Sequence, residues 1–203
     1  MRIKKSLPFI VVLISGHFLT ACSPSELKPA EYIEWSDNPE NNLVKEYQQN
    51  QIKLTCQYTT AEYISLKQSD PENLDEVMVK ENIEMVSEMI HFKLKFEDTT
   101  STNFLRNNYT TPEEFNLKSM YFSYDIQYDL KTVQGGDTAA CVLNHHERTY
   151  GSTPYETLLI AFPKLRKEPV DIELIFNDRV FGLGRVKFFF SKEDLEGIPG
   201  LVF

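Results

Sequence analysis

The chain has 203 residues, and its 21 Lys and Arg against 30 Asp and Glu give a formal net charge of −9. Residues 1–21 hold three cations and no acid, so their removal leaves a mature chain with a charge of −12. Nucleic-acid binding requires clustered cations, and we therefore expect no nucleic-acid partner. A hydrophobic content of 41% supports a folded core, and a chain of this length suits one domain.

The N-terminal run indicates an export signal. Arg2, Lys4 and Lys5 make its start positive, and residues 7–19 are almost unbroken apolar sequence. Such a run is too short for a permanent helix across roughly 30 Å of hydrocarbon, which takes about 20 apolar residues. It is typical of a cleavable signal peptide.

The end of this run, Leu19-Thr20-Ala21-Cys22, resembles the lipobox of bacterial lipoproteins. The resemblance implies that residues 1–21 are a signal peptide and that Cys22 carries a diacylglyceryl group and an acylated amine, with chains such as palmitate. Two acyl signals make a firm membrane anchor. Ser23, in place of Asp, implies sorting to the outer membrane, and the absence of an acidic run after it favours the periplasmic face. We expect residues 22–30 to be a tether and 31–203 a single domain.

Two cysteines remain after acylation of Cys22, and the bacterial envelope permits their oxidation. A Cys56–Cys141 disulfide is possible and would close a long loop. The alternative is two buried thiols that never meet, because both cysteines lie in apolar, strand-like runs. The sequence leaves both alternatives open.

The mature chain is dominated by alternating apolar and polar residues, the pattern of half-buried strands. Strands are predicted at 52–58, 92–96, 120–130, 158–162, 170–176 and 186–190, and one substantial helix from Asp70 to about Met89. A tight hairpin favours antiparallel pairing. We predict a mainly β fold, an antiparallel β-sandwich-like domain with one substantial helix packed beside it, with an α+β layer as the alternative.

The hairpin is predicted at Gly135-Gly136, and a two-residue loop there pairs Leu130 with Cys141. The same register places His146 opposite Asp125 on the outer face and His145 on the inner face, followed by Glu147. Neighbouring strand residues point to opposite faces, so the two histidines cannot share a metal ion. Each remaining pair lacks a third ligand. We therefore expect no metal and no cofactor.

The sequence lacks the common catalytic motifs: there is no Gly-x-Ser-x-Gly, His-Glu-x-x-His, phosphate-binding loop or dinucleotide fingerprint. Asp137-Thr138-Ala139 and Asp98-Thr99-Thr100 resemble the Asp-Thr-x acceptor of a bacterial O-glycosylation system, which implies Thr138 and Thr99 as modification sites. The only tryptophan, Trp35, is expected to pin the start of the domain to the core rather than to stack on a ligand.

Beyond the signal, the chain resembles envelope lipoproteins with a Tyr-Ile-x-Trp stretch near the anchor, here Tyr32 to Trp35, and a Phe-Gly-x-Gly strand near the end, here Phe181 to Gly184. That resemblance implies no catalytic residues. The sequence favours a non-catalytic binding or assembly component, tethered to the membrane, with an envelope protein partner. The alternatives are a glycan- or peptide-binding lipoprotein and a hydrolase with an unrecognised active site.

The lipid anchor yields a direct test. We expect Cys22→Ser to leave the membrane fraction and to lose the mass of the acyl chains, because no other thiol stands at the cleavage point. Detergent-phase partition and intact-mass measurement check both effects. Cys141→Ser is the control and should behave as the parent does. A Cys22→Ser protein that partitions like the parent contradicts the prediction.

Overall fold

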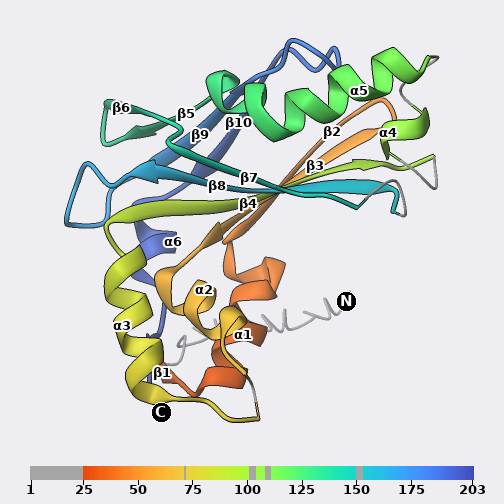
Figure 1. Ribbon diagram of the computed structural model, residues 1–203. Helices are drawn as coiled ribbons and strands as arrows, with labels where there is room; N and C mark the ends of the chain where they lie inside the picture. Colours follow the sequence, from red (N-terminus) through yellow and green to blue (C-terminus); the bar gives the residue numbers. More distant parts are fainter. Residues whose placement is uncertain (1–24, 71, 101–103, 108–110, 150–152) are drawn as a thin grey trace, which may run out of the picture.

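Two antiparallel sheets packed face to face form the body of the protein, shown as a computed structural model in Figure 1. The structure describes residues 25–203 except 71, 101–103, 108–110 and 150–152. Several helices lie at the two ends of the sheets. The predicted mainly β, antiparallel fold is confirmed, and the helices make it a β-rich α+β domain.

The larger sheet has five strands in the order β2-β3-β4-β8-β7, and every neighbouring pair is antiparallel. Its strands are β2 (Val44–Gln49), β3 (Ile52–Thr59), β4 (Met89–Asp98), β7 (Leu143–Glu147) and β8 (Tyr155–Pro163). Even-numbered residues of β3, β4 and β8 turn toward the second sheet, and odd-numbered ones turn outward, as strand geometry dictates.

The smaller sheet has the order β10-β9-β5-β6. Its strands are β5 (Leu130–Gln134), β6 (Asp137–Ala140), β9 (Ile172–Asn177) and β10 (Arg185–Phe190). The predicted hairpin is confirmed, because Gln134 pairs with Asp137 and Lys131 with Ala140. Gly135 and Gly136 have φ of 56° and 99°, which the two-residue turn requires and which glycine adopts without strain.

The core lies between the two sheets and is rich in aromatic side chains. Phe96 of β4 is fully buried, and its ring centroid lies 5.1–6.3 Å from those of Phe104, Phe122, Phe176 and Phe181. These four rings come from two helical segments, from strand β9 and from the turn before β10. Phe96 therefore joins the five-stranded sheet to the smaller sheet and to the helical cover.

A second, smaller core holds the end of the molecule where the described chain begins. It takes side chains from β1 (Glu26–Leu27), α1 (Pro29–Asp37), α2 (Ala61–Gln68), α3 (Glu76–Val86) and β11 (Gly200–Leu201). The chain also forms the short helices η1 (Pro39–Asn41) and α6 (Lys192–Glu196), and Leu195 of α6 packs in the main core. β1 pairs in parallel with β11, and α1 begins at Pro29. Residues 26–30, expected to belong to the tether, thus lie within β1 and at the start of α1. Cys22 lies outside the described residues.

The predicted long helix is also shorter than expected. The carboxylate of Asp75, not that of Asp70, accepts the amide N–H groups of Val77 and Met78 and caps α3. Asp70 instead accepts the N–H of Glu72 in a turn. The far end is wrong too, because the residues from Met89 onward already form β4. Pro71 lies outside the described residues.

The predicted strand at 120–130 is wrong. The chain there continues a helical segment made of α5 (Pro112–Met120), the π-helical turn η2 (Tyr121–Asp125) and the 3-10 turn η3 (Ile126–Asp129), after the short α4 (Phe104–Asn107). Thr111 caps α5 by accepting the N–H of Glu114. The expected pairing of this stretch with residues 141–145 does not form, because β7 belongs to the other sheet and pairs with β8.

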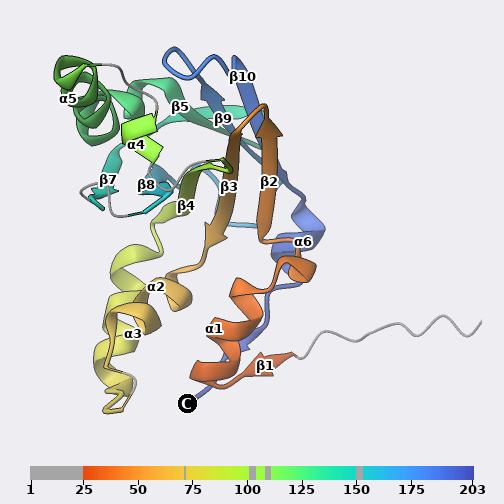
Figure 2. The same ribbon diagram turned by 90° about the vertical axis from the view of Figure 1, so that its right-hand side faces the viewer.

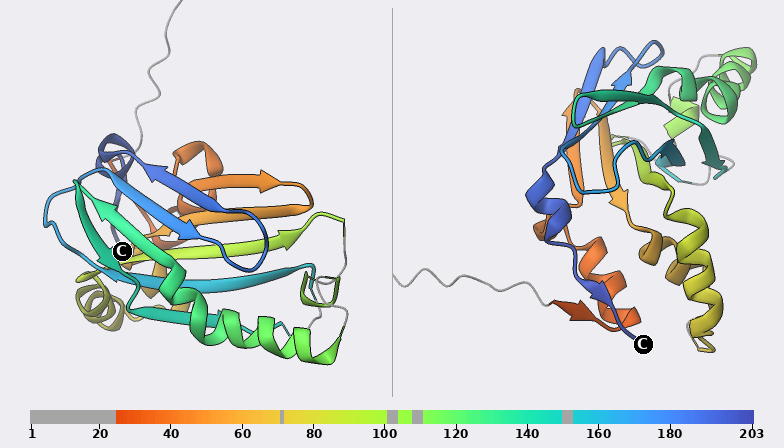
Figure 3. Two further views of the ribbon diagram at one scale, coloured as in Figure 1. Left: turned by 90° about the horizontal axis from the view of Figure 1, so that it is seen from above. Right: turned by 90° about the vertical axis from the view of Figure 1, so that its left-hand side faces the viewer.

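The two ends of the molecule differ. Figures 1 and 2 both place β1, the C-terminus and helices α1, α2 and α3 at one end, and α5 at the other. Figure 3 shows the helical segment running alongside β7 at the edge of the five-stranded sheet. Among the described residues, no helix is both long and apolar enough to cross a membrane.

The position of Phe96 yields a stability test. We expect Phe96→Ala to lower the free energy of unfolding by about 3–5 kcal/mol, because it removes a buried ring and leaves a cavity among four others. The control is Phe189→Ala on β10, where the side chain is 53% exposed and the change should stay within about 0.5 kcal/mol. Urea unfolding measures both, and equal losses would show that Phe96 does not join the layers.

Candidate functional site

The inward-facing side chains at and just beyond β7 hold the π-helical turn η2 in place. The Asn144 side chain donates a hydrogen bond to the carbonyl oxygen of Phe122 at 2.9 Å. The His146 ring stacks on the Phe122 ring, with centroids 5.3 Å apart. Arg148 Nη2 donates to Ser123 Oγ at 3.3 Å. Residues 144, 146 and 148 share one face because side chains alternate along a strand.

Glu156 of β8 is a fully buried carboxylate beneath this turn. Its Oε2 lies 2.7 Å from His146 Nε2, and its Oε1 accepts the hydroxyl of Thr149 at 2.9 Å. His146 pairs across the sheet with Leu158, so Glu156 lies diagonally beside it on the same face. Taking a carboxylate out of water costs several kcal/mol, and this pairing offsets that cost.

Ser123 completes a chain of polar contacts that runs from the buried carboxylate to the surface. Its Oγ lies 3.4 Å from His146 Nδ1 and donates to the Ser119 carbonyl oxygen at 2.8 Å. A carboxylate only accepts, so Nε2 of a neutral His146 carries the proton toward Glu156. Nδ1 then presents a lone pair to Ser123. The geometry fixes the tautomer through the partner of the other ring nitrogen.

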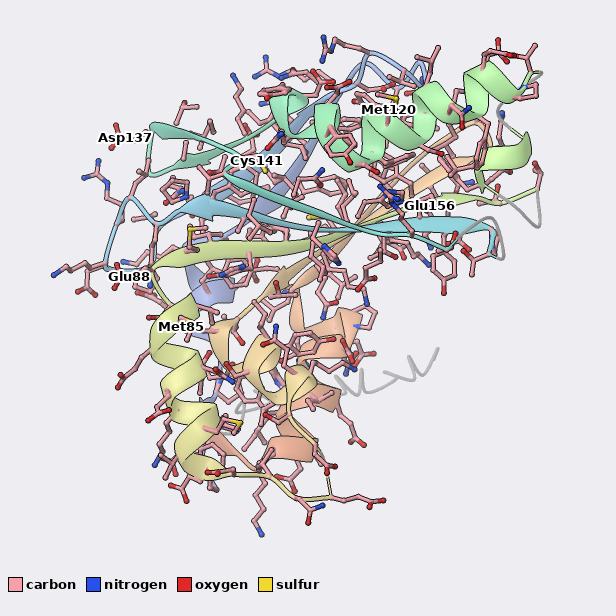
Figure 4. All side chains as sticks on the ribbon, viewed as in Figure 1. Met85, Glu88, Met120, Asp137, Cys141 and Glu156 are labelled. Atoms are coloured by element: carbon pink, nitrogen blue, oxygen red, sulfur yellow. The ribbon has the colours of Figure 1, made fainter. Side chains whose placement is uncertain are left out.

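A cavity of about 440 Å³ opens onto Ser123, His146 and Arg148. Its apolar wall comes from α4 and α5, through Leu105 and Phe115, and continues to the surface at Met120. Figure 4 shows Glu156 on β8 beneath the helical segment that carries Met120. The site therefore combines an apolar wall with a cation and a hydroxyl next to a buried ionisable pair, a lining of the kind that small-molecule cavities have.

Next to this cavity runs a row of exposed apolar side chains that we call the apolar row. It consists of Leu117, Met120, Tyr124 and Tyr128, which are 66%, 55%, 58% and 78% exposed. Their spacing of three and four residues is that of one helix face. Met120 and Tyr124 also line the cavity, so the row and the cavity form one continuous surface.

The lower end of the helical segment is fixed independently of the cavity. The hydroxyl of Tyr121 donates to the buried Asp129 at 2.7 Å, and Arg179 Nε lies 2.7 Å from the other carboxylate oxygen. Burial raises the pKa of Tyr121, with the hydrogen bond to Asp129 adding to the effect. The Tyr121 hydroxyl therefore keeps its proton, and the segment is held at both η2 and η3.

The sequence-based orientation of the two histidines is reversed. His146 is buried and faces the inside, whereas His145 is exposed on the outer face. Asp125 lies in η2 rather than on a strand opposite His146, because the chain changes sheets after β6. Glu147 is exposed at the end of β7. Within the described residues, no group of three His, Cys, Asp or Glu side chains comes together to hold a metal ion.

His145 borders a second cavity, of about 600 Å³, between helices α2 and α3 and the outer face of the five-stranded sheet. His91 on the same face lies 3.0 Å from the carbonyl oxygen of Val86, through Nε2. Burial lowers the pKa of His91, so this ring is neutral and donates to that carbonyl. The contact joins the end of α3 to β4 and is accounted for by structure alone.

The two cysteines are free thiols, so the disulfide alternative is not the one found. Cys56 faces the core from β3, whereas Cys141 lies in the connection between β6 and β7 and donates to the Leu143 carbonyl oxygen. Burial raises the pKa of the Cys56 thiol well above its ordinary value and that of Cys141 to about 11. Both thiols stay protonated near neutral pH.

The remaining sequence candidates lie away from the cavity. Thr138 is exposed on β6, and Thr99 is exposed after β4, where its N–H donates to the Gln51 carbonyl oxygen. O-glycosylation at these two residues stays a prediction. Trp35 is half-buried in α1 and packs against the main core, as expected. A ligand-stacking role for it loses support.

Sequence reasoning missed Ser123, Arg148 and Glu156. Glu156 could have been found from the sequence, because it alternates with Leu158 and Ile160 on the inward face of β8. A carboxylate at such a buried position needs a polar partner. Ser123 could not have been found in this way, since residues 120–130 were interpreted as a strand. Its position depends on the helical register of α5, which sequence alternation concealed.

Comparisons with known proteins add little to this geometry. No protein-family model matches the chain, and the search of curated proteins finds no significant match. One similar solved structure is a DUF4426 family protein from Pseudomonas aeruginosa, 8% identical, covering 73% of this chain and 92% of that one. Its TM-score of 0.37 is too low to carry an inference.

The His146–Glu156 contact yields a coupling test. We expect the single changes His146→Leu and Glu156→Leu each to destabilise the fold, because each leaves its buried partner unpaired. The double variant should lose less than the sum, with a coupling energy of about 1–3 kcal/mol from a double-mutant cycle by urea unfolding. Strictly additive losses would contradict a direct interaction.

Proposed function

We propose that this chain is a membrane-anchored envelope lipoprotein whose domain is a binding or assembly module, with the apolar row as its docking surface. The observation that carries the proposal is the row itself, four large apolar side chains exposed along one helical segment. Single exposed apolar residues need no explanation, but we interpret four large ones gathered along a single helical segment as an interaction site. An assembly role needs such a surface.

The position of the row argues for a protein partner rather than lipid. Cys22 precedes Ser25 by three residues, so an anchor on Cys22 holds Ser25 within about 11 Å of the acylated residue. Ser25 accepts the N–H of Gly200, next to the parallel pair β1–β11. The apolar row lies at the other end of the molecule, on the segment that carries Met120 (Figure 4). The proposed anchor therefore turns the row away from the bilayer.

The chemistry of the row and its surroundings defines the partner further. Tyr and Met are enriched in the cores of protein–protein interfaces. Exposed carboxylates, Glu113 and Asp125, flank the row on a mature chain whose formal charge is −12. The partner we propose is an envelope protein with an apolar patch and cations around it. Such a rim accelerates association and makes it sensitive to salt.

Substitution within the row tests this proposal. We expect Tyr128→Ser to reduce recovery of the partner about tenfold or more, because truncating an aromatic hot-spot residue costs about 2 kcal/mol or more and about 1.4 kcal/mol already corresponds to tenfold. The measurement is quantitative mass spectrometry of proteins crosslinked to the full chain in living cells and recovered with it. Met85→Ser on α3 is the matched control, since Met85 is 73% exposed but lies at the other end.

The outcome depends on the comparison between variants, not on capture alone. Some proteins will be recovered in equal amounts with the parent, with Tyr128→Ser and with Met85→Ser. Such a protein does not bind through the apolar row. If every recovered protein behaves in that way, the docking proposal is wrong. Asp125→Lys adds a second readout, because loss of the acidic rim should weaken recovery at low salt more than at high salt.

A further inference from the structure

We propose that Ser123 is a nucleophile and that the Ser123–His146–Glu156 chain hydrolyses carboxylic esters with an apolar acyl group. This inference goes beyond docking and concerns the cavity beside the apolar row. It rests on three observations that docking leaves unexplained: a fully buried carboxylate, a histidine between that carboxylate and a serine, and a cavity that opens onto the serine.

Burying the His146–Glu156 pair costs desolvation free energy that a purely structural role would not require. A buried ion pair often contributes no more to stability than well-packed apolar side chains of similar volume. Leu158 and Ile160 show that this face of β8 accepts such side chains. A carboxylate at position 156 is therefore better explained by what it does to His146, whose ring orientation and tautomer it fixes.

The contacts are in the order that proton transfer requires. Glu156 accepts from His146 Nε2, and His146 Nδ1 faces Ser123 Oγ at 3.4 Å. Such contacts are often long without substrate and shorten when it binds. The hydroxyl donates to the Ser119 carbonyl oxygen, and rotation about the Cβ–Oγ bond of Ser123 redirects its proton to His146.

The backbone around Ser123 is unusual as well. Residues 121–125 form a π-helical turn, which is rare and frequently occurs at functional sites. The wider turn brings Ser123 over His146 and Arg148 while Phe122, next to it, enters the core. Ser123 is half-buried and lines the cavity, so its oxygen is accessible to a ligand.

The reaction follows in two balanced steps. Ser123 Oγ attacks the ester carbonyl carbon as its proton passes to His146 Nδ1, and the carbon–oxygen bond to the alcohol breaks as that proton passes to the leaving oxygen. Water then gives a proton to His146, its oxygen bonds to the carbonyl carbon, and the acyl–Oγ bond breaks as the proton returns to Ser123. Glu156 is a positioning residue that stabilises the protonated imidazole.

The surroundings define the substrate class. Leu105, Phe115 and Met120 form an apolar wall for the acyl chain. Arg148 Nη2 lies 3.3 Å from Ser123 Oγ, and we assign it as the hydrogen-bond donor to the oxyanion of the tetrahedral intermediate. The cavity of about 440 Å³ lies within the range of small-ligand sites, so short to medium acyl esters fit it.

Labelling with a fluorophosphonate tests the nucleophile directly. We expect one covalent adduct on the full chain by intact mass, mapped to Ser123 in the parent protein. Ser123→Ala should lose both the adduct and hydrolysis of p-nitrophenyl butyrate, which should fall to the rate in buffer. Ser87→Ala is the control, since this serine lies at the end of α3, outside the cavity lining, and should leave both readouts in place. An unlabelled parent, or an adduct at another residue, overturns the proposal.

The positioning role of Glu156 has its own readout. Among the described residues, Glu156 contacts the His146 ring directly, Arg148 reaches the adjacent Ser123, and η2 packs Phe122 and Ser123 against the ring. We expect Glu156→Gln to slow labelling and to move the acid limb of its pH profile to lower pH, because an amide no longer stabilises the protonated imidazole. An unchanged profile would overturn this role. Because Tyr128→Ser leaves Ser123 intact, docking and hydrolysis can fail separately.

Discussion

The contact between His146 and Glu156 is the interaction on which the upper end of the molecule depends. It places a carboxylate and an imidazole in the buried interior, where neither group is tolerated alone. In this pair, the His146 ring stacks on the Phe122 ring and directs its Nδ1 toward Ser123. The helical turn is therefore held by stacking and hydrogen bonding from β7, and its path exposes the residues on its opposite side.

The way β7 holds the helical segment explains why that segment exposes so much apolar surface. Phe122 and Ile126 are buried in the core, while Leu117, Tyr124 and Tyr128 remain in solvent. A chain selected only for stability would place polar side chains there, since those positions add nothing to the core. The account we propose gives the two ends of the domain different tasks: the end at β1 stays beside the membrane, and the helical end meets other molecules.

Much of the fold follows from the sequence, and the failure that matters for the site has one cause. The hairpin at Gly135-Gly136 was predictable because its turn chemistry is local and its register follows from a two-residue loop. The segment 120–130 was not, because its apolar residues alternate while half of them are exposed. Alternation predicts a strand only if all apolar residues face the core. The site was hidden by the same error, since Ser123 meets His146 only when this stretch is helical and β7 joins the other sheet.

The most direct measurement of the central claim is amide hydrogen exchange across the chain, in the parent and in Glu156→Leu, under native conditions. If the His146–Glu156 pair holds the helical segment in place, the backbone amides of residues 112–129 should exchange faster in the variant. The amides of β9 and β10 should keep their protection, because local opening is confined to the element that lost its contact. An equal change in both regions, or no change in 112–129, would contradict the account.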